Sequence, residues 1–399
     1  MASSINASTS SGVVTTADNS GILNLQSNGT TVATINSSGF NLPSANTINA
    51  ANTFGFKNRL INGNMVIDQR NAGASVTPAD LTYTLDRWYA RQTTSGKFSV
   101  QQNAGAVTPP AGFTNYLGCT SLSAYSVGST DLFAIEQRIE GFNSADLSWG
   151  TANAKTITLS FWVRSSLTGN FGGNLRNGGS DYNYAFSYSI PVANTWTQIS
   201  VTISGPTAGT WAGATNGIGV IVELALGVGA SYVGTGGVWT SSPVFAPTGS
   251  VSVVGTSGAT WYVTGVQFEV GSQATSFDFR SIGTELALCQ RYFEVYVSGG
   301  NNTGIMAMST GSTTSGRGTY IQKVQKRANP SSVTFLAANQ YLYQGAGINA
   351  APSAISVAVS SPSAVLVDVT ISGATAFQTA NLLENSAAGT NSISISAEL

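Results

Sequence analysis

The most restrictive feature of this sequence is a series of short segments in which apolar and polar residues alternate strictly. The clearest of them are residues 156–164, 196–203, 219–226 and 262–270. In a β-strand such alternation places every second side chain on one face. Clusters of Gly, Asn and Pro separate the segments, as expected for turns. Together they predict an all-β chain whose centre is a two-sheet sandwich or jelly roll.

The composition shows that this chain can bury a core without much charge. Only 8% of its residues are charged, yet 42% are hydrophobic, including seven Trp, 14 Tyr and 17 Phe. No apolar run reaches the roughly 18 residues of a membrane helix, so we expect no membrane insertion. The net charge is −1 and no basic patch stands out, so we expect no nucleic acid partner. We place the small basic cluster of Lys323, Lys326 and Arg327 on a solvated strand face.

The types of residue present also limit the chemistry. There is no histidine, which excludes Ser-His-Asp and Cys-His catalysis within this chain. Cys119 and Cys289 lie too far apart in the sequence for a zinc signature, and we interpret them as two buried free thiols. No Asp-rich run suggests a calcium loop. We therefore expect no cofactor and no metal, and only catalysis by carboxylates remains open.

Shifts in composition divide the chain into four predicted parts. Residues 1–55 contain one charged side chain, Asp18, and a hairpin signal at Asn28-Gly29, and we interpret them as an attachment segment. All seven tryptophans lie between residues 88 and 261, which marks a central β-sandwich over 56–280. Residues 281–298 contain the one helix candidate, capped by Thr284, and a connecting strand. Alternating segments at 353–360, 364–372 and 392–399 predict a smaller C-terminal β-domain over 299–399, its last strand running to the chain end. The start of the chain has no signal-peptide pattern, so we expect synthesis in the cytoplasm.

Three stretches resemble known proteins. NRLINGNM at 58–65 with IDQRNAG at 67–73 resembles the start of a module common in bacteriophage tail-fibre proteins. WYVTGVQFEVGS at 261–272 and GTELALCQRYF at 283–293 resemble the end of that module, and SISAEL at 394–399 resembles the close of such fibres. The intervening module is similar to a carbohydrate-binding jelly roll. The resemblance implies a virion fibre, usually a homotrimer, that contacts host-surface glycans.

Aromatic residues near turns are the candidate glycan-binding residues, because sugar rings stack on aromatic faces while their hydroxyls bond to polar side chains. The candidates are Asp181, Tyr182, Tyr184, Trp211 and Trp239, the first three within or just after a Gly-rich loop predicted at 172–181. The alternative for each aromatic residue is packing in a core or a trimer interface. Trp196 and Trp261 begin predicted strands and are assigned to structure.

Carboxylates are the remaining catalytic candidates. Glu136 and Glu140 lie on one strand about 13 Å apart at 3.3 Å per residue, beyond the spacing of a glycosidase pair. Arg138 lies between them, so we interpret the three as a charge ladder.

Together with the resemblance described above, the sequence predicts a non-enzymatic virion fibre with residues 1–55 bound to other virion proteins, acting at the host cell surface. The alternatives are a carboxylate-dependent polysaccharide depolymerase spike and a secreted carbohydrate-binding protein.

Overall fold

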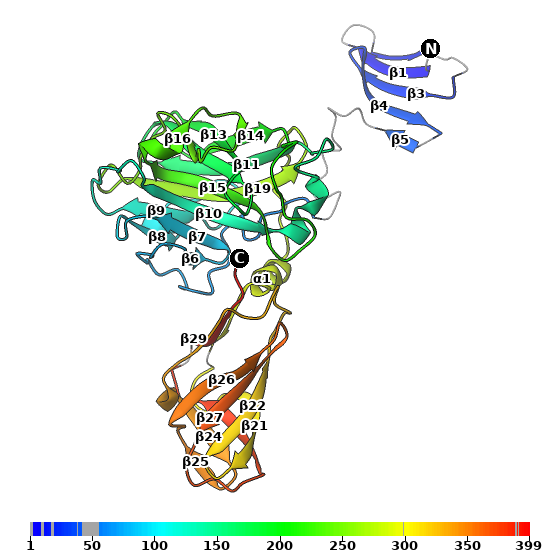
Figure 1. Cartoon of the computed structure of the whole chain (residues 1–399). Coiled ribbons are helices and arrows are strands. Elements are labelled where there is room, and N and C mark those ends of the chain that lie inside the picture. Colours follow the sequence, from blue (N-terminus) through cyan, green and yellow to red (C-terminus); the bar gives the residue numbers. More distant parts are fainter. Residues whose placement is uncertain are drawn as a thin grey trace. The chain divides into compact units, whose positions relative to one another are not determined.

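The computed structural model describes residues 3–8, 12–16, 20–37, 39–41, 56–297, 299–387, 389 and 391–399. The chain divides into two compact units, Met1–Phe56 and Lys57–Leu399, which are described separately (Figure 1). Within the described residues no helix is long and apolar enough to cross a membrane.

The first unit is a five-stranded sheet in the order β2-β1-β3-β4-β5. Its strands are β1 (Ser3–Ser8), β2 (Gly12–Thr16), β3 (Leu23–Ser27), β4 (Thr30–Asn36) and β5 (Gly39–Asn41). The predicted hairpin is confirmed: β3 and β4 pair antiparallel around Asn28 and Gly29, both at positive φ as a tight two-residue turn requires. Val32 and Ile35 remain 36% and 40% exposed. This sheet therefore leaves apolar side chains uncovered within its own unit.

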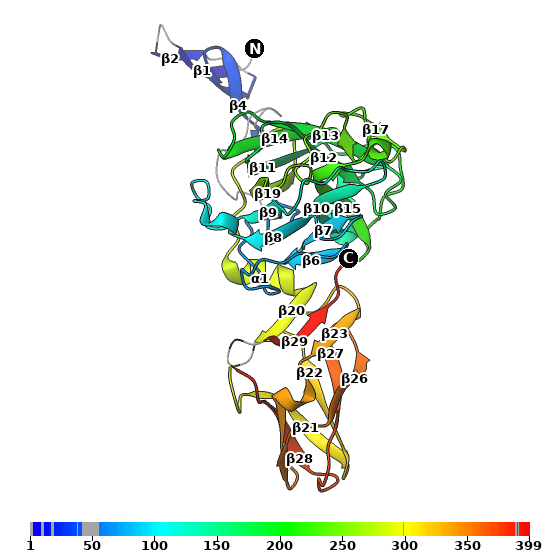
Figure 2. The same cartoon turned by 90° about the vertical axis from the view of Figure 1, so that its left-hand side faces the viewer.

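The second unit begins with a β-sandwich, as the sequence predicts (Figure 2). One sheet has the order β17-β13-β12-β15-β10-β7-β6 and the other β14-β11-β19-β9-β8. The seven-stranded sheet comprises β6 (Thr82–Leu85), β7 (Trp88–Gln92), β10 (Leu132–Glu140), β12 (Gly169–Arg176), β13 (Asn183–Ile190), β15 (Ile218–Val228) and β17 (Trp239–Thr240). The five-stranded sheet comprises β8 (Phe98–Gln102), β9 (Leu117–Ser121), β11 (Ile157–Ser165), β14 (Thr197–Ile203) and β19 (Thr260–Val270). The short strands β16 (Val233–Gly234) and β18 (Ala246–Pro247) pair with each other.

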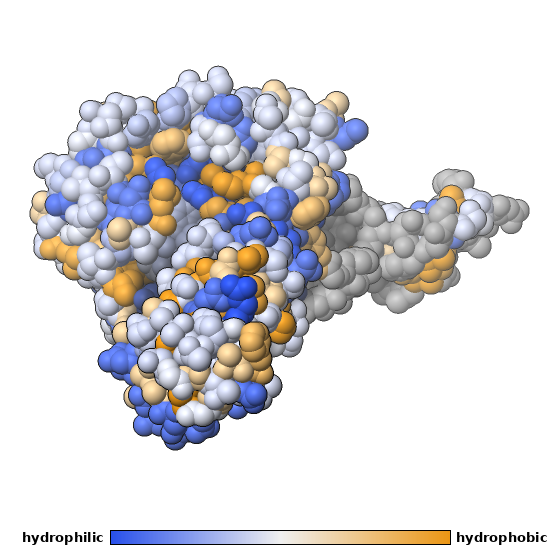
Figure 3. Space-filling view, turned by 60° about the horizontal axis from the view of Figure 1, so that its bottom comes forward, coloured by the Kyte–Doolittle hydropathy of each residue, from blue (hydrophilic) through white to orange (hydrophobic). Residues whose placement is uncertain are grey.

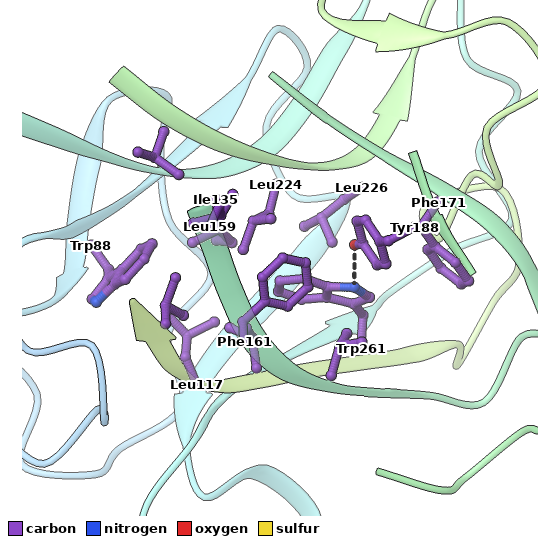
Figure 4. Close-up of a cluster of buried hydrophobic side chains, with 14 of the residues drawn as sticks. Trp88, Leu117, Ile135, Leu159, Phe161, Phe171, Tyr188, Leu224, Leu226 and Trp261 are labelled. Atoms are coloured by element: carbon purple, nitrogen blue, oxygen red, sulfur yellow. Dashed lines mark hydrogen bonds between the residues drawn. The ribbon is translucent and has the colours of Figure 1, made fainter. Parts of the chain in front are cut away.

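The inward residues of both sheets form one hydrophobic core (Figure 4). The predicted inward set of β11 is confirmed, since Ile157, Leu159, Phe161 and Val163 are all at most 1% exposed. Trp261, which was assigned to structure, is fully buried, and its indole N–H donates to the Tyr188 hydroxyl at 3.1 Å. This bond satisfies the one polar group of the ring inside an apolar core.

The helix α1 (Ile282–Gln290) follows the sandwich and leads into the C-terminal strands. Its cap is Ser281, whose hydroxyl accepts from the Thr284 backbone N–H, so the prediction of Thr284 as the cap is wrong. Ser281 precedes the first helical residue, which is the position from which a side-chain oxygen reaches a free N–H of the first turn.

Cys289 in α1 and Cys119 in β9 are buried free thiols, as predicted.

The C-terminal strands form two further sheets, ordered β20-β29-β23 and β25-β24-β28-β21-β22-β27-β26. Their bounds are β20 (Phe293–Val297), β21 (Gly304–Ser312), β22 (Ser315–Ile321), β23 (Ser332–Phe335), β24 (Tyr341–Gly345), β25 (Ile348–Ala350), β26 (Ala354–Ser360), β27 (Ala364–Thr370), β28 (Thr379–Glu384) and β29 (Asn391–Ser396). The predicted strand at 392–399 ends at Ser396, because the residues that follow turn to polar groups of the sandwich.

The basic cluster at 323–327 does not lie on a solvated strand face, so that prediction is wrong. Lys326 is 1% exposed, and its ammonium group donates to Glu294 at 2.5 Å and to the Gln290 carbonyl at 2.6 Å. Arg327 reaches back to the sandwich, as described below.

On the face shown in Figure 3, hydrophobic residues form separate groups among hydrophilic and neutral ones.

Candidate glycan-binding pocket

Four of the predicted aromatic residues meet in one cluster, which a fifth aromatic residue completes. Trp149 lies at its centre, with ring centroids 4.8 Å from Trp211 and 5.4 Å from Trp239. Tyr182 stacks on Trp239 with an interplanar angle of 6°, and Tyr184 contacts the same indole at 5.1 Å. Trp149 and Trp211 come from the loops after β10 and β14, and Tyr182 comes from the turn before β13. Tyr184 lies in β13 and Trp239 in β17. Three separate loops of the sandwich thus converge at this cluster.

Hydrogen bonds fix the three indole rings in the cluster. The Nε1–H groups of Trp149, Trp211 and Trp239 donate to the carbonyls of Lys155, Ala208 and Ser204 at 2.8, 3.1 and 2.8 Å. Glycines allow the close packing: a Cβ at Gly209, where φ is +88°, would meet the Tyr182 ring at 2.8 Å. Because the indole N–H groups are already satisfied, the rings can offer a ligand only their apolar surface.

A pocket of about 400 Å³ lies beside the cluster, with Trp149 and Trp211 in its wall. Ligand pockets in proteins span roughly 300–1,000 Å³, so its volume suits a small ligand. The rest of its lining is uncharged and consists of small, polar and aliphatic residues: Ser144, Ala145, Leu147, Ser148, Thr151, Asn153, Ala212, Gly213, Gly219 and Val220. None of these lining residues carries a charge.

Charged groups beside the pocket are paired with one another. Asp146, between two lining residues, accepts from Arg59 at 2.5 and 2.8 Å and lies 3.6 Å from the ammonium group of Lys155. The hydrogen bond from Arg59 lowers the pKa of the Asp146 carboxyl. In contrast, the side chains of Ser148 and Asn153 make no hydrogen bond within the described part of the chain. These two groups can therefore both donate to and accept from a ligand.

The remaining predicted site residues lie behind the pocket or beside it. Tyr182, Tyr184 and Trp239 are half-buried and support Trp211 and Trp149 rather than lining the pocket. Asp181 is exposed, and its carboxylate accepts from the Asn177 amide at 2.5 Å. The predicted Gly-rich loop at 172–181 is wrong in its first half, because β12 continues to Arg176 and only the turn from Asn177 is a loop. Trp149 was not predicted, although Gly150 beside it marks a turn in the same way as the glycines near Trp211 and Trp239.

The acidic residues of β10 lie in another part of the sandwich, and the interpretation as a charge ladder is wrong. Glu136 is fully buried and faces Glu223 on the neighbouring β15, with the Arg176 guanidinium bonded to both carboxylates. Burial tends to raise the pKa of Glu136, but the charge of Arg176 and the hydrogen bonds to this carboxylate together lower that pKa, whereas burial raises the pKa of Glu223 well above its usual value. Arg138 binds the Tyr89 hydroxyl instead of its two neighbours.

Glu140, at the end of the same strand, accepts from Arg291 at 2.7 and 2.9 Å and from the Tyr292 hydroxyl at 2.6 Å. The acidic residues in the middle and at the end of β10 are thus both occupied by structural contacts. Among the described residues, no group of three or more Cys, Asp or Glu side chains is placed to hold a metal ion.

Comparison with known proteins adds little to this picture. No family model and no curated protein sequence matches the chain. The solved structures that it resembles include the enzymatically active domain of tailspike protein 4 of bacteriophage CBA120, at 13% identity and a TM-score of 0.30, covering 62% of this chain and 25% of that one. The chain therefore spans about a quarter of the length of that domain.

Carbohydrate-binding modules are also among the similar structures. A CBM4 structure has 14% identity and a TM-score of 0.28, covering 52% of this chain and 97% of that one. TmCBM61, solved in complex with β-1,4-galactotriose, has 10% identity and a TM-score of 0.28, covering 54% of this chain and 99% of that one. TM-scores this low carry no weight for fold or function, so the function proposed below rests on the chain's own residues.

Proposed function

We propose that the sandwich binds a neutral glycan in the pocket beside Trp149 and Trp211, and that the chain is a non-catalytic fibre subunit of a bacteriophage virion. The observation that supports glycan binding is that two aromatic rings and several uncharged polar side chains line the same pocket. A sugar ring offers an apolar C–H face to the indoles and hydroxyls to Ser148 and Asn153.

The charge around the pocket favours a neutral sugar over an acidic one. Arg59 and Lys155 lie beside the pocket, and both are held by Asp146. A carboxylate or sulfate entering the pocket would lose water without gaining a cation, which is costly. We therefore expect neutral oligosaccharides to bind and their uronic acid counterparts to be rejected.

Gly213→Phe tests the pocket directly. A Cβ at Gly213 would meet no atom within 4 Å and Gly213 lines the pocket, so we expect the added ring to enter the pocket volume. We expect at least a tenfold loss of affinity for neutral gluco- or galacto-oligosaccharides of two to four residues, measured by titration calorimetry, with an unchanged melting temperature. Gly283→Phe is the matched control, because Gly283 also has open space but lies on α1. Equal affinity of Gly213→Phe and the parent would reject this pocket, and release of sugar from host envelope material would reject the non-catalytic role.

The proposed role as a fibre subunit rests on the exposed apolar surfaces of the chain and on the sequence resemblance of residues 58–73 and 261–293 to tail-fibre proteins. Residues 1–55 would attach to other virion proteins, since Val32 and Ile35 of the first unit stay exposed. The edge strand β26 leaves Val359 61% exposed, and an uncharged edge invites pairing with another chain. A homotrimer would cover such edges, and three weak glycan sites on one particle would gain avidity at the host surface.

Light scattering of the purified full-length chain tests the oligomer. A homotrimer should have about three times the chain mass of 41.0 kDa. Val359→Lys adds a charge to the exposed edge and should lower the measured mass toward that of one chain. A stable single-chain species of the parent at micromolar concentration would contradict the homotrimer.

A further inference from the structure

We infer that the C-terminal strands control this pocket, because Arg327 positions its rim loop, defined as residues 211–217. Docking of the C-terminal strands and glycan binding should then reinforce each other. This inference rests on the proposed function for its ligand, and its structural half can be tested without any ligand.

The rim loop connects the pocket wall to the start of β15, and its first residue, Trp211, packs in the aromatic cluster. It includes the lining residues Trp211, Ala212 and Gly213, and the next two lining residues begin β15. Its remaining residues are small and uncharged. The Thr215 N–H bonds within the loop to the Gly213 carbonyl at 2.7 Å. A loop of this kind takes its position mainly from whatever holds it from outside.

Beyond the packing of Trp211, two sets of hydrogen bonds attach the rim loop to other parts of the chain. On one side, the Gly141 and Phe142 N–H groups donate to the carbonyls of Gly217 and Thr215, each at 2.8 Å. On the other side, Arg327 and Asn216 form a reciprocal pair. The Arg327 guanidinium donates to the Asn216 carbonyl at 2.7 Å, and the Asn216 amide donates to the Arg327 carbonyl at 3.0 Å. This pair joins residues that are 111 positions apart in the sequence.

Arg327 is in turn fixed by the end of the chain. Its Nε donates to the Ala397 carbonyl at 2.6 Å and its Nη2 to the Glu398 carbonyl at 2.7 Å. Each of its three guanidinium nitrogens therefore has a backbone partner, and only one of those partners belongs to the rim loop. A planar guanidinium with three fixed bonds holds a more definite orientation than a flexible ammonium group would.

Both sets of hydrogen bonds to the rim loop are connected through Arg291. The Arg327 N–H donates to the Arg291 carbonyl at 3.1 Å, and the Arg291 side chain binds Glu140, the residue directly before Gly141. A shift of residues 291–327 would therefore move both contacts to the loop at once. Since coupling between two equilibria is reciprocal, a ligand that requires the ordered loop also favours the docked C-terminal strands.

Arg327→Ala tests this inference in two ways. Hydrogen exchange of the ligand-free protein should be at least fivefold faster at the amides of 211–217, and affinity for the same neutral oligosaccharides should fall at least threefold. Arg327→Lys should lie between Ala and the parent, because lysine keeps the charge but not the fork of donors. Arg317→Ala is the control: Arg317 is exposed on β22 and, among the described residues, its side chain pairs with Asp368 alone, so exchange and affinity should stay at parental values.

Asn216→Ala provides a second variant on an exposed loop, in case Arg327→Ala fails to fold. It removes the amide bond but keeps the backbone acceptor, so it should speed exchange of the loop about twofold. Parental exchange and parental affinity in a folded Arg327→Ala protein, or parental exchange in Asn216→Ala, would overturn the inference. If the parent binds no glycan, the proposed function fails, while the exchange rates still decide whether Arg327 holds the loop.

Discussion

Arg176→Met is expected to lower the free energy of unfolding by about 3–5 kcal/mol, the usual cost of breaking a buried ion pair by removing one partner. Arg176 is 4% exposed and bonds to Glu136 and Glu223, which are both fully buried. Met fills much of the same volume without charge, so the loss would come from the carboxylates that it leaves unpaired. Urea unfolding at pH 7, followed by tryptophan fluorescence, measures the difference from the parent.

Two further measurements separate charge from packing at Arg176. Adding Glu136→Leu and Glu223→Leu to Arg176→Met removes all three charges and should restore most of the lost stability. Without the guanidinium, both buried carboxyls should bind protons more tightly in the folded than in the unfolded state. Arg176→Met should therefore become more stable, relative to the parent, as the pH falls from 7 toward 5. A loss below 1 kcal/mol at pH 7, or no gain at lower pH, would contradict this account of the network.

The alternating segments predicted the strands well, but they could not predict what covers the outer face of a sheet. Glu223 alternates with the core residues Val222 and Leu224, which by itself indicates a solvated position. In the structure, residues 244–246 lie over this face: the Asn174 amide donates to the Val244 carbonyl at 2.7 Å, and Arg176 lies 5.2 Å from the Phe245 ring centroid. A connection with little regular structure thus buries charges that periodicity assigns to the surface.

The candidate site shows the same limit at the level of single residues. Aromatic side chains beside glycines could be found in the sequence, and the structure brings Tyr182, Tyr184, Trp211 and Trp239 together. Which ring lines a pocket depends on how three loops pack, and no local pattern encodes that. Arg327 was out of reach for the same reason, since its partners come from a loop 111 residues earlier and from the chain end.

We expect substitution of Glu398 to weaken the contact between the C-terminal strands and the sandwich. It is 7% exposed, and its carboxylate bonds to the buried Arg87 and, at 2.8 Å, to Arg70. The two guanidinium groups also stack on consecutive aromatic residues, Arg87 on Tyr292 and Arg70 on Phe293, each at 3.6 Å. One carboxylate thus binds two cations that also stack on the aromatic residues at the start of β20.

Glu398→Ala should therefore cost about 3–5 kcal/mol, because it leaves the buried Arg87 without its anion. The C-terminal strands should also unfold before the sandwich, giving a second transition in urea and early protease cleavage between 299 and 390. Asp368→Ala is the matched control: Asp368 pairs with the exposed Arg317, and an exposed ion pair contributes at most about 1 kcal/mol. Adding Arg87→Met to Glu398→Ala should recover part of the loss, since the unpaired cation is then absent. If Glu398→Ala behaves like Asp368→Ala, the buried pair does not hold the C-terminal strands to the sandwich.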